Sequence, residues 1–156
     1  MSPAVANLIS TVFYAGHFPK GPGTVGALVA LAIAYLMQDA FGAGSTFLVG
    51  ITLLVSPLGM WAATITAREL GNGDPSVVVI DEVVGQWLTL IGATAFTPTS
   101  WLLAFVFFRL FDIWKPWPIR RFEHLQPAGV GIVADDLMAG LYGAAALQLC
   151  GQWGLY

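Results

Sequence analysis

The chain has 156 residues, of which 57% are hydrophobic and only 10% are charged, and its mean hydropathy is +0.76. Soluble domains carry about 25% charged residues, so this composition predicts an integral membrane protein, organised as a single domain over residues 1–156. A net charge of -3 without an extended basic cluster argues against a nucleic-acid partner, and the lone Cys150 excludes an intrachain disulfide.

The first half of the chain is expected to hold a lead-in and two helices. Residues 1–19 are mildly apolar and predict an interfacial or partly helical segment. Glycines and prolines then interrupt the chain, and Thr24 is an N-cap candidate for a first apolar run over 25–37. A second helix is predicted over 46–70, with a kink at Pro57, and the glycine, asparagine and proline that follow it are a strong turn signal.

The next two apolar runs are short. Asp81 and Glu82 open a third run over 83–96, and Ser100 is the N-cap candidate for a fourth run over 101–114. About 20 apolar residues are needed to cross a bilayer as a helix, so these two runs are expected to tilt, to thin the bilayer or to re-enter.

The remaining residues complete the predicted bundle. A short amphipathic segment is expected over 119–123 and a loop over 126–131, and Asp135 and Asp136 open a last run over 137–156. The sequence therefore predicts an all-α membrane bundle of about five apolar helices. With hairpin turns at 39–45 and 96–100, every Lys and Arg falls on the opposite side, which the positive-inside tendency makes cytoplasmic.

Five carboxylates lie near the predicted ends of three apolar runs on that same side: Asp81, Glu82, Asp112, Asp135 and Asp136. A carboxylate at membrane depth is costly unless it is paired or bound to a metal. Mg²⁺ prefers carboxylate oxygens together with water and phosphate, so these five residues are candidate ligands of Mg²⁺. Helix capping is the alternative, because Asp and Glu also favour the first turn of a helix.

Three of the four basic residues of 107–121 are candidate phosphate ligands, whereas contact with anionic lipid alone is the favoured interpretation for Arg121. Arg109, Asp112 and Lys115 follow one another at spacings of three, which places them on one helical face. Arg109 and Lys115 are expected to meet phosphate, with Arg120 as a weaker candidate; a structural ladder of ion pairs is the alternative. Gly23 and Thr24 belong to a glycine-rich stretch before a helix, where backbone N–H groups bind anions, although a plain turn gives the same pattern.

Four blocks of the sequence together resemble the phosphatidylglycerophosphatase A family: PGTVG (22–26), DEVVG (81–85), RLFDIWKPWPIR (109–120) and GVGIVADD (129–136). The third block is long and specific. The resemblance implies a Mg²⁺-dependent phosphatase of the bacterial inner membrane that converts phosphatidylglycerophosphate to phosphatidylglycerol, with its active site on the cytoplasmic face.

The resemblance implies a role for each candidate residue in phosphate hydrolysis. Asp81, Glu82, Asp112, Lys115 and Asp136 are expected to be catalytic, and Gly23, Thr24, Arg109, Lys115 and Arg120 to bind phosphate. Direct attack by water and an aspartyl-phosphate intermediate both remain open. The other functions considered are a small transporter, a scaffold whose charges only bind anionic lipid, and an alcohol phosphotransferase, although the spaced Asp pattern typical of the last is absent.

Overall fold

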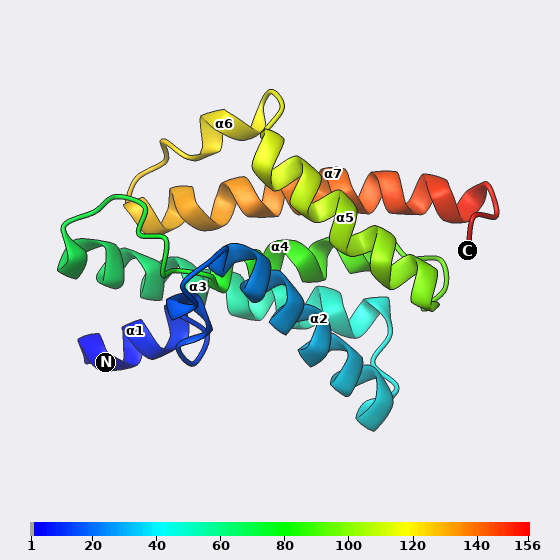
Figure 1. Ribbon diagram of the computed structural model, residues 1–156, viewed down its shortest axis with the longest axis horizontal. Helices are drawn as coiled ribbons and strands as arrows, with labels where there is room; N and C mark the ends of the chain where they lie inside the picture. Colours follow the sequence, from blue (N-terminus) through cyan, green and yellow to red (C-terminus); the bar gives the residue numbers. More distant parts are fainter. Residues whose placement is uncertain (1) are drawn as a thin grey trace.

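The computed structural model describes residues 2–156, and these residues form helices with no strand, which confirms the all-α prediction (Figure 1). The elements in chain order are α1 (Pro3–Ser10), the 3-10 helix η1 (Ala15–His17), α2 (Pro22–Phe41), α3 (Ser45–Leu70), α4 (Ile80–Ile91), α5 (Pro98–Trp114), α6 (Ile119–Phe122) and α7 (Ala128–Gln152).

The helices differ in length in the way that the sequence predicted. Helices α2, α3 and α7 are long and apolar enough to cross a membrane. Helix α4 has 12 residues and α5 has 17. At about 1.5 Å per residue α4 extends only ~18 Å, against ~30 Å of hydrocarbon. It is therefore a buried partial span rather than a full crossing.

Helix α4 lies at the centre of the bundle, where it contacts α2, α3, α5 and α7 (Figure 1). Its apolar side chains are buried between these neighbours, and Val83, Val84 and Leu90 have essentially no exposed surface. The indole Nε1 of Trp87 donates a hydrogen bond of 2.9 Å to the carbonyl oxygen of Ala30, which ties α4 to α2. The first turn of α4 is thereby held among the ends of other helices.

Glycines set the close crossing of α4 and α7. A Cβ on Gly140 would lie 2.5 Å from the carbonyl oxygen of Gly85, and a Cβ on Gly85 would lie 2.7 Å from that of Asp136. Small residues let membrane helices approach until their backbones touch. This contact brings the acidic first turn of α4 against the part of α7 that carries Asp136.

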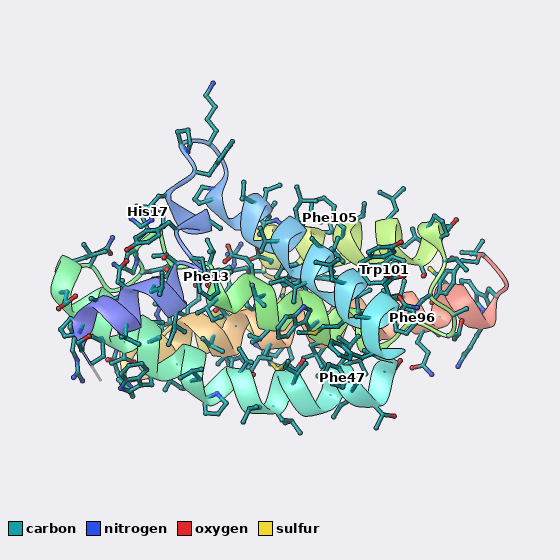
Figure 2. All side chains as sticks on the ribbon, turned by 90° about the horizontal axis from the view of Figure 1, so that it is seen from below. Phe13, His17, Phe47, Phe96, Trp101 and Phe105 are labelled. Atoms are coloured by element: carbon teal, nitrogen blue, oxygen red, sulfur yellow. The ribbon has the colours of Figure 1, made fainter. Side chains whose placement is uncertain are left out.

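The turn between α4 and α5 lies earlier than predicted. Helix α4 ends at Ile91 and not at 96, and its C-cap Gly92 packs against the backbone of Ala144 in α7. Thr97, and not Ser100, is the N-cap of α5; the two residues form a capping box in which each side chain accepts the other's backbone N–H. Phe96 and Trp101 meet at this end of the bundle, with ring centroids 5.8 Å apart (Figure 2).

The prediction for the start of the last helix was also wrong. Helix α7 begins at Ala128, so the expected loop over 126–131 is mostly helical. Its glycines serve close packing: a Cβ on Gly129 would lie 2.1 Å from the carbonyl oxygen of Met60, and the backbone N–H of Gly129 donates to Oγ1 of Thr64. Asp135 and Asp136 consequently lie inside the helix, where helix capping does not explain them.

The N-terminal part of the chain agrees with a partly helical lead-in. Helix α1 packs against α3, and the hydroxyls of Ser10 and Thr66 share a hydrogen bond of 2.8 Å. Thr24 is not the N-cap of α2, because that helix begins two residues earlier at Pro22. Its N-cap is Gly21, whose φ of 63° is a left-handed conformation that glycine adopts without strain.

Candidate active site

A cavity of about 350 Å³ lies where α2 and α4 begin and α5 ends. We call it the acidic cavity. Its lining comes from six parts of the chain: residues 21–23, the α3–α4 loop, the first turn of α4, the end of α5, Glu123 just after α6, and the first half of α7. The charged side chains that line it are Asp74, Asp81, Glu82, Arg109, Asp112, Lys115, Glu123, Asp135 and Asp136.

The acidic cavity gathers most of the residues that the sequence singled out. All five predicted carboxylates line it, together with Gly23, Arg109 and Lys115. Thr24 and Arg120 do not line it. Arg120 instead lies on a separate groove beside α5.

Three carboxylates form a tight group that we call the carboxylate cluster: Asp81, Glu82 and Asp136. One oxygen from each lies within 4.8 Å of the other two. Each residue also has a buried oxygen without a hydrogen-bond partner among residues 2–156: Oδ1 of Asp81, Oε2 of Glu82 and Oδ2 of Asp136. Buried carboxylates this close repel one another unless a cation or protons compensate them. The cluster therefore has the oxygen-rich, anionic character that a hard divalent cation requires.

The other two carboxylates face cations. Asp112 in the last turn of α5 accepts a hydrogen bond from Nη1 of Arg109, one helical turn earlier. The same Nη1 lies 3.8 Å from Oε1 of Glu82, so Arg109 connects Asp112 with the carboxylate cluster. All three side chains are mostly buried, at 12–16% exposure. The predicted spacing of Arg109 and Asp112 on one helical face is thus confirmed.

Lys115 contacts Asp135 of α7 and Glu123, and does not pair with Asp112 as their spacing suggested. The reason is its backbone, since Lys115 follows the last turn of α5 in a left-handed conformation with φ 46° and ψ 62°. Burial lowers the pKa of the Lys115 ammonium, but the hydrogen bonds that it donates to Asp135 and Glu123 outweigh burial and raise the pKa above its ordinary value. Lys115 is therefore a fixed positive charge at the wall of the cavity.

The glycine-rich stretch allows the start of α2 to approach Glu82 closely. A Cβ on Gly23 would lie 2.0 Å from Oε1 of Glu82 and 3.1 Å from Nη1 of Arg109. Gly26, one turn further along α2, would place a Cβ 2.9 Å from Cβ of Val79. The absence of side chains at these two positions lets the start of α2 lie directly on the start of α4.

Comparison with known proteins gives these residues a family. The family model for phosphatidylglycerophosphatase A matches residues 8–150, which includes every residue of the acidic cavity. The chain belongs to the phosphatidylglycerophosphatase A family. The resemblance that the four sequence blocks indicated is thereby confirmed.

Individual relatives match most of the chain. Phosphatidylglycerophosphatase A of Escherichia coli (strain K12) is 36% identical over 94% of this chain and 83% of its own length. That of Haemophilus influenzae is 33% identical over 94% of this chain and 89% of its own. A Bacteroides thetaiotaomicron protein, named provisionally as a phosphatidylinositol-3-phosphatase, is 38% identical over 86% of both chains. No solved structure matches the chain.

Sequence reasoning missed two contributions to the cavity. Glu123 is the second partner of Lys115, and its only signal was its place just after the basic stretch. The α3–α4 loop, residues 73–76, closes another side of the cavity and brings Asp74 to it. The turn signal around Asn72 located this loop but not its direction, which depends on how α3 and α4 pack.

Proposed function

We propose that this protein is a Mg²⁺-dependent phosphatase that hydrolyses phosphatidylglycerophosphate to phosphatidylglycerol and inorganic phosphate. The carboxylate cluster carries the proposal, because three buried oxygens that lack partners within residues 2–156 face one cavity beside two cations. Membership of the family, and the names of the relatives from Escherichia coli and Haemophilus influenzae, support the substrate.

The donor set of the cluster fits a magnesium ion. Asp81, Glu82 and Asp136 offer oxygen atoms only, and their unpartnered oxygens are those that a hard cation would satisfy. Mg²⁺ bound to such residues offsets the charge of a phosphate group and lowers the pKa of a bound water. Asp112 and Asp135 take a supporting role in this assignment, since each already holds a cation of the cavity.

The two cations are suited to the terminal phosphate of the substrate. Arg109 and Lys115 line the same cavity as the cluster, and their carboxylate partners hold them in place. Preorganised positive charge of this kind stabilises the charge that spreads over phosphoryl oxygens in the transition state. The bond from phosphorus to the glycerol oxygen breaks as a new oxygen bonds to phosphorus, and the leaving oxygen takes up a proton; water supplies the new oxygen either directly or by later hydrolysis of an aspartyl-phosphate.

The distribution of charge supports a cytoplasmic location for the acidic cavity. Lys20 and Arg68 lie at the helix ends nearest this cavity, as do the four basic residues of 109–121. Asp39 lies beside Thr97 and Pro98 at the other end of the bundle. Positive charge gathers on the cytoplasmic side of membrane proteins. In a bacterial inner membrane the active site would then open toward the cytoplasmic leaflet.

One assay tests the proposed reaction. Purified protein in detergent is given phosphatidylglycerophosphate with Mg²⁺ or with EDTA, and released phosphate is measured. Release that requires Mg²⁺ and is lost in Asp81→Asn supports the proposal; no release by the wild-type protein would refute it. Phosphatidylinositol 3-phosphate, assayed in parallel, tests the specificity that the name of the Bacteroides relative raises. Ion flux in liposomes without phosphate release would instead favour a transporter.

A further inference from the structure

A second hollow, which we call the α5 groove, runs along the outer side of α5. Val106, Leu110 and Ile113 lie at spacings of four and three, so they form one stripe along the helix, and Trp114 extends it. These side chains are 46–71% exposed. An exposed apolar stripe on a helix of a membrane bundle lies against lipid chains.

The α5 groove borders the acidic cavity. Arg109 and Ile113 line both hollows, so only these two side chains stand between them. Arg109 has a buried Nε without a hydrogen-bond partner among residues 2–156, while its Nη1 faces Asp112 and Glu82. The guanidinium therefore retains an unused donor where the two hollows meet.

Arg120 places a second positive charge on the α5 groove, away from the carboxylates. Its side chain is exposed, and its hydrogen bond, from Nη2 to the carbonyl oxygen of Trp114, is long at 3.5 Å. Within residues 2–156 it forms no salt bridge with Asp or Glu. A cation with free donors beside an apolar stripe matches a lipid phosphate next to its acyl chains.

We propose that the α5 groove binds the phosphatidyl half of the substrate, with Arg120 on its phosphodiester and an acyl chain along Val106 and Leu110. This inference rests on the proposed function. Phosphatidylglycerophosphate carries two phosphates joined by one glycerol. The protein offers two positively charged sites, Lys115 in the acidic cavity and Arg120 on the α5 groove, and Arg109 lines both hollows. The terminal phosphate enters the acidic cavity, while the phosphodiester stays with Arg120. Arg120 thus selects for lipids that have a second phosphate.

Kinetics on matched variants test this assignment. We expect Arg120→Gln to raise the KM for phosphatidylglycerophosphate, and the inhibition constant of the product phosphatidylglycerol, about tenfold each, because one charge-assisted hydrogen bond is lost. The kcat stays within about twofold, since the reacting phosphate is bound elsewhere. The matched control is Arg121→Gln, which removes a neighbouring charge that lies 5.4 Å from the ring of Trp117 and not on the groove.

A second variant separates the acyl chain from the head group. Val106→Trp fills the apolar stripe and is expected to raise the KM for phosphatidylglycerophosphate about tenfold, while the KM for its deacylated, water-soluble analogue stays unchanged. The inference is overturned if Arg120→Gln changes the KM for phosphatidylglycerophosphate no more than Arg121→Gln does. It is also overturned if Val106→Trp raises the KM for the lipid and for its deacylated analogue equally.

Failure of the proposed function gives a different result. If the wild-type protein releases no phosphate from phosphatidylglycerophosphate, that function is refuted whatever the variants do. The groove is then judged by native mass spectrometry of phosphatidylglycerol retained by the full chain. Retention by the wild-type protein and Arg121→Gln but not by Arg120→Gln supports an anionic-lipid groove, and equal retention by all three rules it out.

Discussion

The carboxylate of Glu82 lies directly on the backbone of Gly23, with Oε1 in the space that a Cβ at that position would occupy. A glycine on α2 and an acid on α4, distant in sequence, thus form one wall of the acidic cavity. Because the obstructing atom is the end of a flexible side chain, a methyl group here would displace Glu82 rather than the helices.

Gly23→Ala should therefore reduce activity without unfolding the protein. We expect kcat/KM to fall about 100-fold, the loss that a 1 Å misplacement of a catalytic group produces, while the melting temperature changes little. Phosphate release and thermal unfolding in detergent measure the two effects. Gly50→Ala is the control, since a Cβ there meets nothing within 4 Å. A large loss of stability in Gly23→Ala would contradict this view of Glu82.

Asp136→Asn and Asp81→Asn should each abolish activity and also change how metal affects stability. If the carboxylate cluster binds Mg²⁺ as proposed, the ion should raise the melting temperature of the wild-type protein by mass action. Each variant relieves repulsion within the carboxylate cluster, so we expect higher stability in EDTA and a much smaller increase on adding Mg²⁺. Calorimetry or fluorescence with and without Mg²⁺ makes the comparison. Asp39→Asn, at the other end of the bundle, should behave as wild type.

Lys115→Met should destabilise the fold strongly, because it leaves Asp135 buried without its cation. Removing one partner of a buried ion pair costs about 3–5 kcal/mol. Glu123→Gln should cost much less, since the Glu123 side chain is 36% exposed. Unfolding free energies from denaturant titration test the order of the two variants. Equal losses of unfolding free energy in the two variants would show that the buried carboxylate of Asp135 is not stabilised by Lys115.

The raised pKa of Lys115 gives a pH prediction of defined sign. A raised folded-state pKa contributes stability that is fully present below the unfolded value, about 10.4, and is lost only as pH rises through the folded value. Lys115 should therefore cause no loss of stability between pH 7 and 9. Unfolding midpoints of the wild-type protein and Glu123→Gln, compared across this range, should differ by a constant amount, because Lys115 stays charged and keeps Asp135 as its partner in both.

Gly140→Ala should weaken the contact between α4 and α7. The added Cβ would lie 2.5 Å from the carbonyl oxygen of Gly85, which is backbone and cannot rotate away. Overpacking of this kind costs about 1–3 kcal/mol. We expect lower thermal stability together with weaker Mg²⁺ binding, because the same contact holds Asp136 near Asp81. If stability falls but Mg²⁺ affinity is unchanged, the contact between α4 and α7 does not position the carboxylate cluster.

The sequence predicted the long helices and the set of charged residues better than it predicted their pairing. Apolar length and a turn signal located α3 to within one residue of its start. The glycines near Gly129 resembled a loop, although their purpose is close packing of α7 on α3. The spacing of Arg109 and Asp112 predicted their contact, but the left-handed Lys115 left that helical face for Asp135. Such choices depend on tertiary contacts that spacing does not encode.

Asp135 and Asp136 are neighbours in the chain, but they point about 100° apart around α7. One meets Lys115, and the other meets the acids of α4. A rotation of α7 by one residue in one direction would put Asp135 in the place of Asp136 and leave Lys115 without a partner; in the other direction it would put Asp136 opposite Lys115 and remove an acid from the carboxylate cluster. Hydrophobicity alone does not determine the rotational orientation of a helix that is surrounded by lipid. In this protein the adjacent acids supply that information, so correct assembly of the bundle and completion of its reactive centre are the same event.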